Sequence, residues 1–166
     1  MALLFVVGLA LSGKRPDGGL AEFKAAGLMT AFAPEDARGV EITANGTVWR
    51  FRRDDTWHAV ETPRPAPSDV AQRIDAALRL LRNSGPLRTL TVAEVAQVPA
   101  AEYALGPESL RVEVRSASDT AFRIQFGGLN PLGVARYARV DGVEGLPMLP
   151  TYVAEAWEHV IEERQK

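Results

Sequence analysis

The sequence predicts an α+β domain, built as a mainly antiparallel sheet with two longer helices packed on it and preceded by a short apolar N-terminal segment. Three observations predict this class. Several segments alternate polar and apolar residues, and tight turns join them. Two other segments repeat apolar residues with a helical period. Strands that follow one another across tight turns pair antiparallel, because parallel strands need long crossovers.

The first strand-rich region covers residues 39–60. Its polar and apolar residues alternate on both sides of Asn45-Gly46, a dipeptide typical of a two-residue hairpin turn. A second turn at residues 53–55 leads to a third short strand over residues 56–60. Before this region, residues 19–32 have a composition that suits a short helix or a packed linker, and Pro34 ends it.

Residues 68–83 form the first of the two longer predicted helices. Prolines keep residues 61–67 extended, Ser68 is the predicted N-cap, and Gly85-Pro86 stops the helix. The apolar residues fall on one stripe, which predicts the buried side: Val70, Ile74, Ala77, Leu78 and Leu81.

The second half of the chain repeats the order of strands and then a helix. A strand is predicted over residues 87–92, and a short helical turn over residues 93–109. Strands over residues 110–117 and 120–127 meet at a Ser118-Asp119 turn, and a further strand covers residues 134–142. Thr151 is predicted to cap the last helix, whose inward residues are Val153, Ala156, Trp157, Val160 and Ile161.

The N-terminus is the most hydrophobic part of the sequence. Residues 2–11 carry no charge, yet ten to twelve helical residues cover only roughly 18 Å of a hydrocarbon core of roughly 30 Å. We expect residues 1–15 to be the tail of a longer membrane or signal-like segment whose start lies upstream; a buried N-terminal strand or helix is the alternative. Lys14 and Arg15 are then cations at the membrane interface. Residues 16–38 are the predicted linker and residues 39–166 the single α+β domain.

The same region resembles a phosphate-binding loop, because Gly8, four residues and Gly13-Lys14 match G-x-x-x-x-G-K. The next residue, Arg15, replaces the hydroxyl residue that would hold magnesium. Pro16 and the glycines after it predict a turn where the loop needs a helix. We therefore predict no nucleotide site.

Composition excludes several other classes of function. The net charge of −2 offers no general attraction for nucleic acid. The absence of Cys excludes disulfides and thiolate metal ligands. Of the two His, His58 has no nearby acid–base partner in the sequence. His159 lies among glutamates at helical spacing (Glu155, Glu158 and Glu162), a pattern more typical of a solvated helix face than of a metal site. No catalytic residue, metal or cofactor is predicted.

The order of motifs between residues 40 and 161 resembles the domain of unknown function 4340 family. The markers are the run Tyr103-Ala104-Leu105-Gly106-Pro107, Phe126-Gly127 about twenty residues later, and then Tyr137-Ala138-Arg139. The resemblance implies a bacterial protein with an N-terminal membrane helix and a domain facing the periplasm, in some members beside ABC transporter components. It implies no catalytic residues. Lys14 and Arg15 argue the other way, since positive charges favour the cytoplasmic side.

A possible interaction surface is centred on the strand over residues 134–140 and the loop before it: Asn130, Arg136, Tyr137 and Arg139. Arginines and aromatic residues are enriched at interaction hot spots; the alternative is that the aromatic residues, Trp49, Phe51 and Trp57 included, pack in the core. Residues 127–131 resemble a glycine-rich ligand loop, but we interpret them as a hairpin connection with glycines at positive φ.

These observations favour a non-enzymatic, membrane-tethered accessory or scaffold domain. It would contact the lipid bilayer through its N-terminus and bind a protein partner in an envelope complex. The family resemblance suggests a complex that is associated with an ABC transporter. The alternative is a soluble periplasmic module that binds a small ligand or glycan on its sheet face. A hydrolase would need a pocket that joins His58 or His159 to a carboxylate and a hydroxyl.

Overall fold

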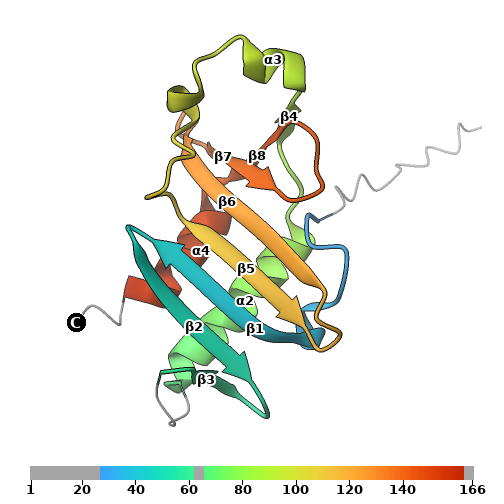
Figure 1. Cartoon of the computed structure of the whole chain (residues 1–166), viewed down its shortest axis with the longest axis vertical. Coiled ribbons are helices and arrows are strands. Elements are labelled where there is room, and N and C mark those ends of the chain that lie inside the picture. The colour runs from blue at the N-terminus through green and yellow to red at the C-terminus, as the bar shows by residue number, and fades with distance from the viewer. Residues whose placement is uncertain (1–26, 62–65, 163–166) are drawn as a thin grey trace, which may run out of the picture.

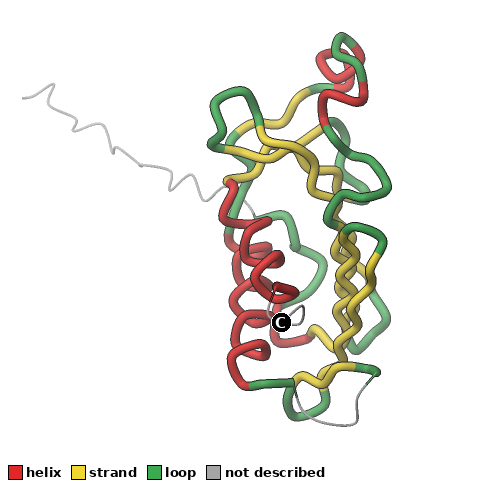
Figure 2. The backbone as a smooth tube through the Cα atoms, turned by 90° about the vertical axis from the view of Figure 1, so that its left-hand side faces the viewer, coloured by secondary structure: helices red, strands yellow, loops and turns green. Residues whose placement is uncertain are grey.

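The computed structural model describes residues 27–61 and 66–162, which contain a single eight-stranded sheet. The strand order is β3-β2-β1-β5-β6-β7-β8-β4, and every neighbouring pair is antiparallel. The two longer helices, α2 (Ser68–Asn83) and α4 (Thr151–Glu162), lie side by side against one face of the sheet (Figures 1 and 2). The predicted α+β class is confirmed.

The remaining elements are short. The strands are β1 (Ala37–Ala44), β2 (Thr47–Arg53), β3 (Trp57–Ala59), β4 (Arg88–Leu90), β5 (Arg111–Ser116), β6 (Ala121–Leu129), β7 (Ala135–Val140) and β8 (Leu146–Pro150). A five-residue helix, α3 (Val92–Ala96), follows β4, and two 3₁₀ turns, η1 (Pro34–Asp36) and η2 (Ala100–Tyr103), precede β1 and β5. The predicted strand over residues 87–92 is shorter because Thr91 caps α3 through a capping box with Glu94.

The β1–β2 hairpin confirms the predicted turn. Asn45 and Gly46 have φ values of 49° and 74°, so both central residues are left-handed, as a type I′ turn requires. The β5–β6 hairpin also turns where predicted, with Asp119 at a φ of 60°.

The core lies between the sheet and the two long helices. All five apolar residues predicted for the inner stripe of α2 are buried there. In α4 the buried set contains Ala154, while Ala156 is only partly buried. Trp49, Phe51 and Trp57 are also core residues, which settles the choice between surface and core for these aromatics.

The predicted N-cap of α2 is wrong by one residue. Pro67 is extended, and its carbonyl accepts the first helical hydrogen bond, from Ala71 N at 3.0 Å. Ser68 is therefore already inside the helix and makes no capping bond. Thr151 is likewise the first residue of α4 and not the residue before it.

Strand β8 was not predicted, because Pro147 and Pro150 argue against a strand in LPMLP. The pairing explains why both prolines are tolerated. β4 pairs with residues 146–148 and β7 with residues 148–150, so each proline has a partner strand on one side only. On its unpaired side, each proline needs no N–H group for the sheet, so it is tolerated as a proline on an edge strand is.

The prediction that Gly127 and Gly128 are turn residues at positive φ is also wrong. Gly127 and Gly128 belong to β6, at an irregularity in its pairing with β7, and Gly133 is the turn residue with a positive φ, 70°. A Cβ atom on Gly127 would lie 2.2 Å from the carbonyl oxygen of Tyr103. The close crossing of η2 over β6 therefore requires glycine here.

The segment before β1 packs on α2 without forming a helix in residues 27–33. Met29 is fully buried, its N–H donates to Leu81 O at 3.2 Å, and its carbonyl accepts from Arg82 Nη1 at 2.9 Å. This matches the packed-linker alternative for these residues.

Residues 1–26, with Lys14, Arg15 and the phosphate-loop-like sequence, lie outside the described residues, as do residues 62–65. Within residues 27–61 and 66–162, no helix is long and apolar enough to cross a bilayer.

Candidate functional site

Helices cover one face of the sheet, and the other face is open across β1, β2, β5 and β6 (Figure 2). We call this the open face. Since side chains alternate along a strand, the residues between the buried core positions lie on it. They are mostly charged. The arginines are Arg50, Arg52, Arg111, Arg115, Arg123 and Arg139, and the strand carboxylates are Glu41 and Glu113.

The register of the strands arranges these side chains in rows. In the first row, Arg50 is opposite Glu41, Glu41 is opposite Glu113, and Glu113 is opposite Arg123. We call this the charged row. In the next row, Thr43 is opposite Arg111, Arg111 is opposite Gln125, and Gln125 is opposite Arg139. We call this the arginine row.

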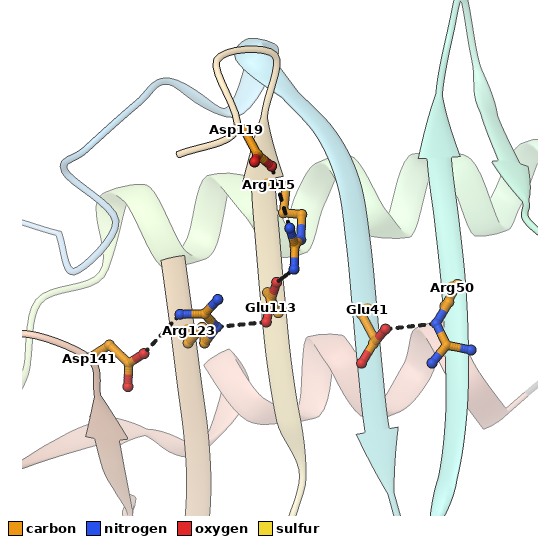
Figure 3. A network of polar contacts seen from close by, with 7 residues as sticks. All are labelled: Glu41, Arg50, Glu113, Arg115, Asp119, Arg123 and Asp141. Carbon is orange, nitrogen blue, oxygen red and sulfur yellow. Dashed lines mark hydrogen bonds and ion pairs between the residues drawn. The ribbon is translucent and has the colours of Figure 1, made fainter. Parts of the chain in front are cut away.

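The carboxylates of the charged row are held by arginines (Figure 3). Arg50 Nε donates to Glu41 Oε2 at 2.7 Å, and Arg123 Nε donates to Glu113 Oε2 at 2.7 Å. Arg123 also reaches across to Asp141 Oδ2, 3.4 Å from its Nη1. The charged row thus holds two separate groups of ion pairs, because Glu41 and Glu113 lie opposite each other with like charges and share no arginine. One is the Arg50–Glu41 pair, and the other, which we call the ladder of ion pairs, joins Glu113, Arg123 and Asp141.

Glu113 is at the centre of this ladder. Arg115 Nη2 lies 2.6 Å from its Oε1, but that oxygen, although buried, has no aligned hydrogen bond among the described residues. Burial acts to raise the pKa of Glu113. The hydrogen bond from Arg123 and the charges of Arg115 and Arg123 outweigh it, so the pKa of Glu113 is lower than its usual 4.5. The same hydrogen bond raises the pKa of Arg123.

The arginine row is not paired in this way. Arg139 is exposed and makes no hydrogen bond or ion pair with the residues that the structure describes. Arg111 donates one bond, from Nη2 to the carbonyl of Gly106 at 3.3 Å, and has no carboxylate partner in the same residues. Side chains of both rows line a shallow hollow of about 290 Å³ on the open face.

The structure separates the four residues of the predicted interaction surface. Asn130 is buried, and its Oδ1 accepts from the N–H groups of Val134 and Ala135, both at 3.0 Å. Arg136 points to the helix side, where its Nη1 lies 2.5 Å from Glu158 Oε1 on α4. Asn130 therefore organises the β6–β7 loop, and Arg136 ties β7 to α4.

The other two lie on the open face. Tyr137 packs edge-on against Tyr103, with ring centroids 4.9 Å apart, and Arg139 lies two residues further along the strand at the hollow. A second hollow, of about 450 Å³, lies between α4, β6 and the segment before β5, and Arg136 and Glu158 line its wall.

Sequence reasoning missed Arg111, Glu113 and Arg123 as site residues. The alternation over residues 110–117 and 120–127 predicts two strands, but it does not distinguish these three residues from other polar strand positions. The Ser118-Asp119 turn, however, fixes the register of those strands, and the register alone would have placed Glu113 opposite Arg123 and Arg111 opposite Gln125.

Three of the four α4 side chains considered for metal binding are engaged with other groups. Glu158 pairs with Arg136, and His159 Nδ1 lies 3.0 Å from Glu162 Oε2. Over the described ranges no three His, Cys, Asp or Glu side chains gather in a way that would hold a metal ion.

No family model, curated protein or solved structure matches the chain. The resemblance to the domain of unknown function 4340 family stays a prediction from the sequence.

Proposed function

We propose that this domain is a non-enzymatic accessory module that binds a partner protein through its open face. The observation that carries the proposal is the one-sided architecture: both long helices lie on one face, and the other presents arginines around a hollow. Arginine is enriched at protein interfaces, because its guanidinium makes several directed hydrogen bonds.

The ladder of ion pairs suits such a surface. Arg123 and Glu113 hold each other in place before a partner arrives, so less side-chain entropy is lost on binding. Their rotamers are supported from both sides, by Asp141 and by Arg115.

A small-ligand or glycan site is the second candidate, and the hollow of about 290 Å³ favours it. Ligand pockets usually measure about 300–1,000 Å³ and are mainly apolar, whereas this hollow is small and lined largely by charged side chains. All three Trp residues are buried, so no indole ring is offered to a sugar. A partner protein therefore fits the open face better than a glycan does.

The tether and its location belong to the same proposal. The uncharged residues 2–11 support attachment to the bacterial inner membrane, and the family resemblance supports a domain on the periplasmic side, in a complex that includes an ABC transporter. A reporter enzyme active only in the periplasm, fused after Lys166, tests the side. We expect this fusion to be active. If it were inactive, and a second fusion with a reporter active only in the cytoplasm were active, the domain would lie on the cytoplasmic side.

Site-specific photo-crosslinking in the native membrane tests the binding face. A photoreactive residue replaces Thr43 on the open face and, as the matched control, the exposed Ala76 on α2. We expect one discrete protein adduct from position 43 and none from position 76. No adduct from position 43, or the same adduct from both positions, would contradict the proposal.

A further inference from the structure

We infer that the open face binds an acidic peptide segment of the partner, and that Arg111 and Arg139 bind its carboxylates. The inference rests on the proposed function and adds the chemistry of the partner. It starts from a difference between the two rows. Glu41 and Glu113 both accept from arginines, while Arg111 and Arg139 have no carboxylate partner among the described residues.

This difference sets the sign of the charge that the hollow attracts. Each carboxylate at the hollow is already committed: Glu41 to Arg50, and Glu113 and Asp141 to Arg123. A basic segment would have to break these pairs and would meet two uncompensated guanidinium groups. An acidic segment completes the arginine row and leaves the charged row intact.

The spacing of the two arginines favours a segment with two carboxylates over a single small anion. Arg111 is on β5 and Arg139 on β7, with β6 between them. Adjacent strands lie about 4.8 Å apart, so the two stems are separated by roughly 10 Å. Acidic residues at positions i and i+2 of an extended segment are roughly 7 Å apart, a difference that the flexible arginine side chains cover. Each guanidinium can then hold one carboxylate with two parallel bonds.

Gln125 lies between the two arginines and supplies a group for the peptide backbone. Its Nε2 donates to the carbonyl of Gly106 at 3.1 Å and to Ser109 Oγ at 2.7 Å, which fixes the amide. The Oε1 atom makes no hydrogen bond within the described residues, so it is left to accept a peptide N–H. Across the three neighbouring strands, the arginine row therefore offers a cation at Arg111, a hydrogen-bond acceptor at Gln125 and a second cation at Arg139.

Fluorescence anisotropy with the full chain in detergent tests the inference. The probe is a labelled twelve-residue peptide of alternating Glu and Ala, compared with the same peptide carrying Gln in place of Glu. We expect the Glu peptide to bind and the Gln peptide not to bind, with an affinity that falls as NaCl rises from 50 to 300 mM. A Gln peptide that binds equally well overturns the inference.

Single variants locate the site. Arg111→Gln and Arg139→Gln should each lower the affinity for the Glu peptide roughly fivefold to tenfold. Arg79→Gln is the matched control, because Arg79 is also exposed and unpaired among the described residues but lies on α2. We expect no change for it. Equal losses for Arg79→Gln and Arg139→Gln would show a nonspecific charge effect and overturn the inference.

The crosslink from position 43 separates the inference from the proposed function. If the wild-type chain gives the adduct and the Arg111→Gln/Arg139→Gln double variant gives the same yield, the open face binds a partner but not through these arginines. A reduced yield supports the acidic segment. No adduct in the wild-type chain instead contradicts the proposed function itself.

Discussion

Trp57 on the edge strand β3 donates a hydrogen bond from its indole Nε1 to Asp75 Oδ1 on α2, at 2.9 Å. The same oxygen accepts from Arg53 Nη2 at 2.6 Å, and the Arg53 guanidinium lies over the indole, 5.0 Å from its ring centroid. Trp157 on α4 is buried just as completely, but its Nε1 has no partner among the described residues. Two buried tryptophans thus differ in whether their polar atom is satisfied.

Replacing each tryptophan by Phe should reveal that difference. Both substitutions remove the same atoms from a buried site, so their packing losses are comparable. Trp57→Phe also removes a donor from Asp75, whereas Trp157→Phe removes an unpaired N–H. We expect Trp57→Phe to lower the free energy of unfolding by about 1–2 kcal/mol more than Trp157→Phe. Urea unfolding of both variants measures this; an equal or larger loss for Trp157→Phe would contradict it.

The helices and hairpins could be predicted because their signals are local. The buried stripe of α2 follows from the spacing of its apolar residues, and the β1–β2 turn follows from Asn45-Gly46. β8 could not be predicted, because tolerance of Pro147 depends on which strand pairs beside it. The requirement for glycine at position 127 arises from the close approach of Tyr103, which is 24 positions earlier in the chain. Both features are set by contacts between distant segments.

Gly127→Ala tests the crossing of η2 over β6. The new Cβ atom would lie 2.2 Å from the Tyr103 carbonyl oxygen, and a backbone atom cannot move aside cheaply. We expect a loss of about 2–3 kcal/mol in the free energy of unfolding.

Gly39→Ala is the control for this substitution. Its Cβ atom would meet the nearest atom, Arg115 Cβ, at an ordinary contact distance of 3.7 Å, and its φ is not left-handed. We expect unchanged or slightly higher stability, since alanine restricts the unfolded chain. If thermal unfolding showed similar losses for both variants, the crossing would not explain Gly127.

Asn130→Ala tests whether this residue organises the β6–β7 loop. Its Oδ1 accepts two backbone N–H groups, and Ala135 N is buried. Without the amide both donors lose their acceptor, which should cost about 1–3 kcal/mol. Leu132→Ala in the same loop is the control, because that side chain is 81% exposed. Differential scanning calorimetry should show a lower Tm for Asn130→Ala alone; equal Tm values would leave Asn130 without a structural role.

The candidate site was harder to predict than the fold, and the reason is again distance. A charged side chain on an alternating strand looks the same in the sequence whether its cross-strand neighbour is an ion-pair partner or not. Arg123 and Arg139 illustrate this, since the first is paired with Glu113 and the second has no partner among the described residues. Only the register of three strands distinguishes them.

Glu113 should make stability depend on pH in a defined window. Its pKa in the folded protein is lowered below 4.5, so its ionised form stabilises the fold. That contribution is fully present above about pH 4.5 and is lost as the pH falls through the lower folded pKa. Because the side chain is partly exposed, the contribution is about 1 kcal/mol at most.

Glu113→Gln measures this contribution as a difference. We expect the variant to be less stable than the wild type at pH 7, and the gap in urea unfolding to close as the pH falls from 4.5 toward 3. Glu144→Gln serves as the control, because Glu144 is exposed and makes no ion pair among the described residues. Its free energy of unfolding should stay close to that of the wild type over the same range of pH. A Glu113→Gln gap that is the same at pH 7 and pH 3 would mean that packing, and not the charge held by Arg115 and Arg123, accounts for the role of Glu113.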